Sequence, residues 1–149
     1  MTSRTLTLHR VLRTTPARLF RALTDPDAIV KWTPPHGFTA KMLAFEPGQG
    51  GHYRMSFTNL GTGHTHSFGG RYLDWEPGKR LRHTDAFDDP NLPGEMVTTV
   101  DIRSVICGVE IRVTQENIPQ VIPLEACYLG WQESLQLLTL LVEPDIPDA

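Results

Sequence analysis

The stretch YLGWQESLQLLTLLVE (residues 128–143) decides the fold, because it is rich in leucine yet too polar to cross a membrane. The helix predicted from about residue 123 to 142 carries residues that recur at helical spacing: Leu124, Cys127, Trp131, Leu135, Leu138 and Val142. Such a helix would be roughly 30 Å long at 1.5 Å per residue. A helix this apolar must cover another part of the chain.

The middle of the chain offers the surface that the helix can cover. From Phe38 to Asn117, short runs alternate apolar with polar residues and are separated by glycine and proline turns, which predicts about six strands. In the last run, Val109, Ile111 and Val113 face one way and charged residues face the other, as in a sheet with one wet face. Strands joined by short turns form an antiparallel meander.

The N-terminal part of the chain adds one strand and two short helices. Leu6 and Leu8 alternate with threonines, which predicts a strand. Thr15-Pro16 and Asp25-Pro26 then repeat the pattern of a capping residue followed by a proline in the first helical turn. The paired glycines at 69–70, inside a predicted strand, indicate a bulge or a sharp bend.

The order of the elements predicts an α+β fold in one domain, residues 1–149. A curved antiparallel sheet of about six to seven strands would wrap around the long C-terminal helix, with two short helices after the first strand. A twisted sheet of this size curls strongly. Curvature around a helix leaves a hollow between the two, so the apolar surface that does not seal the core is expected to line a cavity.

Composition excludes several classes of protein. With 14 Lys and Arg against 17 Asp and Glu, the net charge is −3 and no basic stripe exists, which disfavours nucleic acid as a partner. No apolar run reaches the roughly 18 residues that a membrane span needs. Residues 1–10 lack the apolar core of a signal peptide, and Cys107 and Cys127 form no metal or redox motif. We therefore expect a cytoplasmic protein with reduced thiols.

Three stretches resemble a known superfamily, the START-like (SRPBCC) helix-grip proteins, and within it the homologues of the activator of heat-shock-protein-90 ATPase. These stretches are TTPARLFRALTDPDAIVKW (residues 14–32), FEPGQGGHYRMSF with GRYLDWEPGKRLRHT (residues 45–57 and 70–84), and GWQESLQLL (residues 130–138). The resemblance covers essentially the whole chain and implies the fold described above. Its members include ligand carriers, aromatic-ring cyclases and a co-chaperone domain. They share no catalytic signature, so no catalytic residue and no cofactor are assigned.

The expected ligand-binding residues combine aromatic, thioether and polar side chains. Trp and Tyr suit such a role because each offers a flat apolar face and a polar atom. The set is Trp32, Tyr53, Met55, Phe57, Tyr72, His83, Asp85, Cys127, Trp131 and Leu135. Their alternative role is simple core packing.

His83 and Asp85 lie two residues apart in one predicted strand, about 7 Å along it, on the same face as Leu81. A carboxylate near an imidazole raises the histidine pKa and selects its tautomer. The pair could orient a ligand hydroxyl or carbonyl, or act as a general base. The alternatives are a structural hydrogen-bonded pair or a register that exposes both residues.

Two further patterns have simpler interpretations. His64 and His66, with His52 nearby, could suggest a zinc site, but no carboxylate or cysteine lies close in sequence, so a polar turn is favoured and no metal is predicted. Cys127 could be a nucleophile only with a lowered thiol pKa and a base, and no base is evident, which favours packing.

Three functions remain in order of preference. The first is binding of a small apolar or amphipathic ligand in the cavity. The second is a cyclase- or hydrolase-like enzyme that uses His83 and Asp85 with a tyrosine. The third is a chaperone-associated interaction domain. An exposed edge strand would allow a homodimer in each case.

Overall fold

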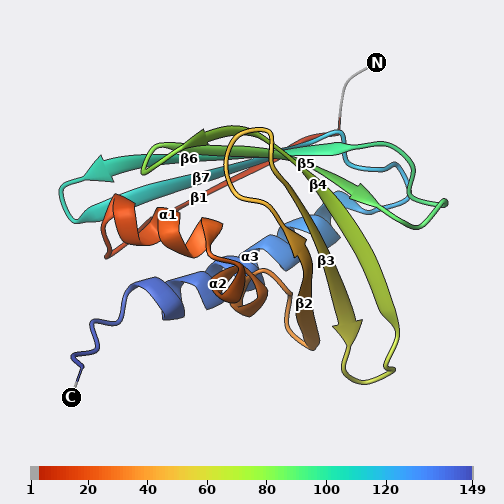
Figure 1. Cartoon of the computed structure of the whole chain (residues 1–149), viewed down its shortest axis with the longest axis horizontal. Helices are drawn as coiled ribbons and strands as arrows, with labels where there is room; N and C mark the ends of the chain where they lie inside the picture. The colour runs from red at the N-terminus through yellow and green to blue at the C-terminus, as the bar shows by residue number, and fades with distance from the viewer. Residues whose placement is uncertain (1–3, 149) are drawn as a thin grey trace.

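The computed structural model describes residues 4–148, in which seven antiparallel strands form one sheet that curves around a long helix (Figure 1). In chain order the elements are β1 (Leu6–Leu12), α1 (Pro16–Thr24), α2 (Pro26–Trp32), β2 (Phe38–Phe45), β3 (His52–Asn59), β4 (Thr65–Glu76), β5 (Arg80–Phe87), β6 (Met96–Val105), β7 (Gly108–Glu116) and α3 (Leu124–Val142). The predicted α+β helix-grip arrangement is confirmed.

Strand order follows the meander, with one exception at the N-terminus. The sheet order is β1-β7-β6-β5-β4-β3-β2, so each strand from β2 to β7 pairs with its neighbour in sequence. β1 pairs antiparallel with β7, which brings Leu8 opposite Val113. The two edges of the sheet are therefore β1 and β2. A register shift between Met42 and Ala44 interrupts the pairing of β2 with β3.

The sheet bends sharply within β4, close to the paired glycines. A Cβ atom on Gly70 would lie 1.7 Å from the Thr84 carbonyl oxygen, so only glycine allows β5 to approach this closely. The backbone N–H of Arg71 donates to the Thr84 hydroxyl at 3.0 Å. The register shift itself lies further along, between Tyr72 and Asp74. In Figure 1, β3 and β4 turn down beside α3, whereas β6 and β7 pass above it.

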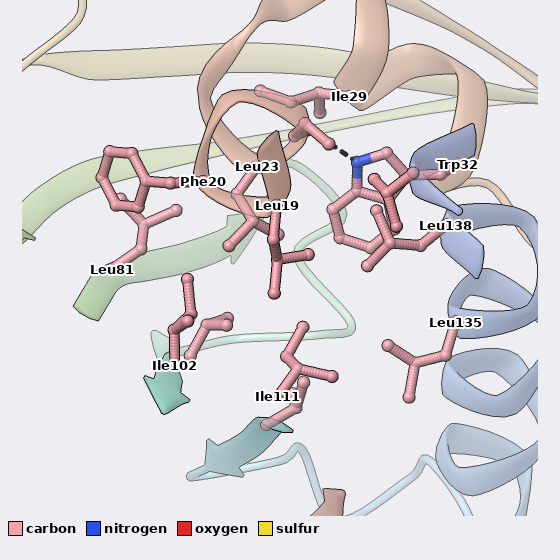
Figure 2. Close-up of a cluster of buried hydrophobic side chains, with 14 of the residues drawn as sticks. Leu19, Phe20, Leu23, Ile29, Trp32, Leu81, Ile102, Ile111, Leu135 and Leu138 are labelled. Carbon is pink, nitrogen blue, oxygen red and sulfur yellow. Dashed lines mark hydrogen bonds between the residues drawn. The ribbon is translucent and has the colours of Figure 1, made fainter. Parts of the chain in front are cut away.

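The caps of the two short helices are those that the sequence predicts. The Thr15 hydroxyl accepts the N–H of Arg18 at 3.2 Å, and the Asp25 carboxylate accepts the N–H of Asp27 at 2.9 Å. Each cap satisfies an N–H that the first helical turn leaves without a carbonyl partner. Trp32 closes the pair, because its indole N–H donates to the Ala22 carbonyl at 2.9 Å (Figure 2).

The second half of α3 completes the main core. Leu135, Leu138 and Val142 are 2%, 0% and 1% exposed, and Figure 2 shows Leu138 beside Trp32. The helix begins within one residue of the position that the sequence predicts. Its outer face also carries apolar residues, since Leu129 and Leu140 are 61% and 66% exposed. Among residues 4–148, no helix combines the length and apolar character that a membrane crossing needs.

Candidate functional site: a cavity between the sheet and the first half of helix α3

A cavity of about 360 Å³ lies between the sheet, α2 and the first half of α3. It falls within the range of small-molecule sites, which begins near 300 Å³. Every residue expected to bind a ligand lines the cavity except Leu135: Trp32, Tyr53, Met55, Phe57, Tyr72, His83, Asp85, Cys127 and Trp131. Leu135 belongs to the core beyond the cavity, where it packs among the large buried side chains.

Small residues on one face of α3 contribute to the open space of the cavity. Ala126, Gly130 and Ser134 lie four residues apart on one face and all line the cavity. A Cβ atom on Gly130 would have no heavy atom within 4 Å, so the helix leaves open space there. From Leu135 onward the inward residues are large and fill the space that the curved sheet leaves.

The carboxylate of Asp85, on β5, accepts hydrogen bonds from three neighbours. The Tyr53 hydroxyl from β3 donates to one oxygen, and the His83 Nδ1–H lies 2.9 Å from that same oxygen. The Thr98 hydroxyl from β6 donates to the other oxygen at 2.5 Å. Asp85 is only 8% exposed, and these donors replace the water that an ionised carboxylate requires.

The network continues across the sheet to α3. Gln115 on β7 donates from Nε2 to the Thr98 hydroxyl at 3.2 Å. The indole N–H of Trp131 donates to Gln115 Oε1 at 3.1 Å. A chain of hydrogen bonds therefore joins the helix to β5 through two strands, and each member fixes the orientation of the next.

Thr98 and Gln115 were not among the predicted site residues. The signal for Gln115 was present, because it has the same parity along β7 as Val109, Ile111 and Val113, which are 0–1% exposed. Thr98 gave a weaker signal, since Thr98 and Thr99 are both buried and polarity does not alternate there. Four polar residues line the cavity without having been predicted: Thr33, Thr98, Gln115 and Ser134.

The imidazole of His83 packs against two tyrosine rings that also contact each other. Its ring centroid lies 5.6 Å from that of Tyr53 and 5.8 Å from that of Tyr72, both in edge-to-face geometry. The side chain is 19% exposed. The two ring contacts and the bond from Nδ1 to Asp85 fix the direction of the remaining ring nitrogen, Nε2.

Electrostatics favour the charged forms of both partners. Burial opposes the charge on His83, but the Asp85 carboxylate and its hydrogen bond raise the pKa of the imidazole above its ordinary value. Burial likewise opposes the charge on Asp85, but His83 and the bonds from Thr98 and Tyr53 lower its pKa. Burial first, and then the Asp85 charge, raise the pKa of Tyr53 and of Tyr72, so both hydroxyls keep their protons.

The pair makes folding stability depend on pH. The raised pKa of His83 gives stability that is fully present below the unfolded value near 6.5 and is lost as pH rises through the folded value. The lowered pKa of Asp85 gives stability that is lost as pH falls below about 4.

We expect the difference in unfolding free energy between wild type and His83→Gln to be largest between about pH 4 and 6.5 and to shrink above pH 6.5. Urea denaturation across pH 4.5–9 measures this, and a difference that grows with pH contradicts it.

Two of the histidines considered as metal ligands, and the cysteine considered as a nucleophile, have packing or ion-pair partners instead. His66 packs against Phe57 and Phe68, with ring centroids 5.8 and 6.1 Å away, and burial lowers its pKa. Nδ1 of His52 instead lies 3.3 Å from Oε2 of Glu46. Within the described range, no three His, Cys, Asp or Glu side chains are grouped to hold a metal ion. Burial raises the pKa of Cys127, so its thiol is not activated as a nucleophile.

Comparison with known proteins places the chain in one family and gives it structural relatives. The family described as "Activator of Hsp90 ATPase homolog 1-like protein" matches residues 13–143. A crystal structure of a Chromobacterium violaceum protein is 51% identical, has a TM-score of 0.93, and the match covers 95% of this chain and 98% of that chain. A Rhodobacter sphaeroides protein is 26% identical with a TM-score of 0.79, over 91% and 90% of the two chains. No curated protein matches the sequence.

Proposed function

Because the chain belongs to the family of activator of Hsp90 ATPase homolog 1-like proteins, a START-like domain, we propose that it binds one small apolar or amphipathic molecule inside the cavity. The cavity between the sheet and α3 carries this proposal. A volume of about 360 Å³ is more than twice the roughly 150 Å³ in which an engineered cavity holds benzene, so a ligand of two or three rings fits. Two free cysteines make the cytoplasm the compartment that we propose for this role.

The hollow favours ligand binding over a role in protein docking alone. An unfilled space in a core costs about 24 cal/mol for each Å³, so a domain that only presents an outer surface gains stability by filling it. Here three of the residues that line it on α3 are small: Ala126, Gly130 and Ser134. The family description names an activator of the chaperone Hsp90. Association with a chaperone would use the outer surface of the domain and would not need the cavity.

The same site supports binding better than catalysis. A histidine acts as a general base only when it is neutral, and Asp85 raises the pKa of His83 and so favours the protonated form. Cys127 keeps its thiol protonated because burial raises its pKa. The groups that face the cavity therefore provide shape, apolar contact and hydrogen bonds.

A neutral fluorescent probe tests the proposal. N-phenyl-1-naphthylamine emits strongly only in apolar surroundings, and we expect its emission to rise on titration with the folded protein and to saturate at one probe per chain. Burial of about 200 Å² of ring surface gives roughly 5 kcal/mol before the costs of association, so a dissociation constant of about 0.2 mM or weaker is expected. Competition by an excess of 2-ethylnaphthalene should return the emission to its starting level. Absence of saturable binding to the folded chain would exclude the proposed function.

A further inference from the structure

Nearly every polar atom that lines the cavity already has a partner within the protein. The indole N–H of Trp32 donates to Ala22, and that of Trp131 donates to Gln115. The Ser134 hydroxyl donates to the Thr33 carbonyl at 2.7 Å, and the Thr33 hydroxyl donates to the Ile29 carbonyl at 2.7 Å. Both oxygens of Asp85 accept hydrogen bonds. These groups therefore have no need of a ligand.

Two atoms differ from the rest: Nε2 of His83 and the hydroxyl of Tyr72. Neither atom has a hydrogen-bond partner among residues 4–148. Neither is among the fully buried side-chain nitrogen and oxygen atoms that lack a partner, so both atoms are accessible. The two residues face each other across the β4–β5 ladder, where Tyr72 pairs with His83. Their ring centroids lie 5.8 Å apart and both residues line the cavity, so one ligand can contact both.

Both atoms act as hydrogen-bond donors toward the cavity. Nδ1 of His83 must donate to Asp85, because an ionised carboxylate only accepts. The adjacent carboxylate favours the protonated imidazole, in which Nε2–H is the second donor. The Tyr72 hydroxyl also keeps its proton. A ligand that meets both groups needs an oxygen with two lone pairs.

The charges around the cavity favour a neutral oxygen over an anionic one. The positive charge of His83 is already matched by Asp85, 2.9 Å away. Among the described residues, no lysine or arginine lines the cavity. An anionic ligand would therefore add a buried negative charge next to Asp85 with no further cation to balance it. A carbonyl oxygen accepts two hydrogen bonds and adds no charge.

We infer that the cavity selects neutral ring compounds that carry a carbonyl oxygen, such as aryl ketones or quinones, and that this oxygen accepts hydrogen bonds from His83 Nε2 and the Tyr72 hydroxyl. The inference rests on the proposed function and adds to it the chemical class of the ligand. Its apolar part would contact the rings of Phe57, Phe68 and Trp131, which line the same cavity.

Three naphthalenes of nearly equal size test the inference by calorimetry: 2-acetylnaphthalene, 2-ethylnaphthalene and 2-naphthoate. The quantity compared is the affinity of the ketone relative to that of the hydrocarbon. Tyr72→Phe removes only the hydroxyl, and we expect it to lower this ratio about threefold to tenfold, as for one neutral hydrogen bond. His83→Leu removes a charged donor and is expected to lower the ratio at least about tenfold. Naphthoate should bind more weakly than the ketone to the wild type.

Each outcome separates the inference from the proposed function. If 2-ethylnaphthalene binds and neither substitution changes the ratio, the carbonyl contact is wrong and the cavity remains a binding site. If naphthoate binds as tightly as the ketone, the preference for a neutral ligand is wrong. If none of the three compounds binds the folded wild type, the proposed function fails and the inference fails with it. Tyr72→Phe alone decides the first case should His83→Leu not fold.

Discussion

Gly130→Trp is expected to lower the affinity for N-phenyl-1-naphthylamine by more than about a hundredfold while the protein stays folded. The new side chain starts from a position where a Cβ atom meets nothing within 4 Å, on the face of α3 that lines the cavity. The indole would take up the space that the probe needs. A probe whose rings cannot enter loses roughly 4–6 kcal/mol of apolar burial, which exceeds the 2.8 kcal/mol that a hundredfold change requires.

A matched substitution on the outer face of the same helix separates blocking from general damage. Gln132 is exposed, so Gln132→Trp adds the same ring to α3 without entering the cavity. We expect unchanged probe affinity in that variant. We expect Gly130→Trp to unfold at or above the wild-type temperature, since tryptophan has a higher helix propensity than glycine. Gln132→Trp should unfold close to the wild-type temperature. Undiminished probe affinity in Gly130→Trp would place the binding site outside the cavity.

Asp85→Leu is expected to lower the free energy of unfolding by about 3–5 kcal/mol, the range for one member of a buried ion pair. The change leaves three donors, on His83, Tyr53 and Thr98, aimed at a side chain that accepts nothing. It also removes the charge that raises the His83 pKa, so the imidazole should become neutral at pH 7. Urea denaturation measures the first effect, and NMR titration of the imidazole measures the second.

Two controls test the cause of that loss. His83→Leu with Asp85→Leu removes both charges, and we expect the double variant to be more stable than Asp85→Leu alone by about 1–2 kcal/mol. Asp88, which pairs with Arg54 on the surface, offers a matched aspartate, and Asp88→Leu should change stability only slightly because solvent screens that pair. Equal losses from Asp85→Leu and Asp88→Leu would contradict a special role for the buried network.

The fold could be predicted closely because its signals are local. Thr15-Pro16 and Asp25-Pro26 mark helix starts through their own cap chemistry, and the structure confirms both. The meander follows from short turns, and the long helix from its spacing. The bend of β4 was less accessible: glycines 69–70 indicate it, but the register shift beyond Tyr72 depends on how β5 approaches.

The site could be predicted only where the alternation of side chains along a strand shows which residues face the cavity. Parity along β3 and β5 is enough to place Tyr53, His83 and Asp85 on the cavity side of the sheet. The hydrogen bond from Thr98 to Asp85 depends on the register between β5 and β6, which the loop of residues 88–95 sets and no pattern encodes. Leu135 has the helical spacing of the predicted set but lies past the point where the cavity ends, because spacing gives the face of a helix and not the depth of the opposing sheet.

The small residues that α3 presents to the cavity, beside the large buried residues nearer its C-terminus, have an evolutionary consequence. Substitutions at positions 126, 130 and 134 can reshape the chamber in steps of a few atoms, while Leu138 and Val142 continue to hold the chain together. Descendants of one ancestral gene could thus acquire new small-molecule preferences without first gaining extra stability to tolerate the change.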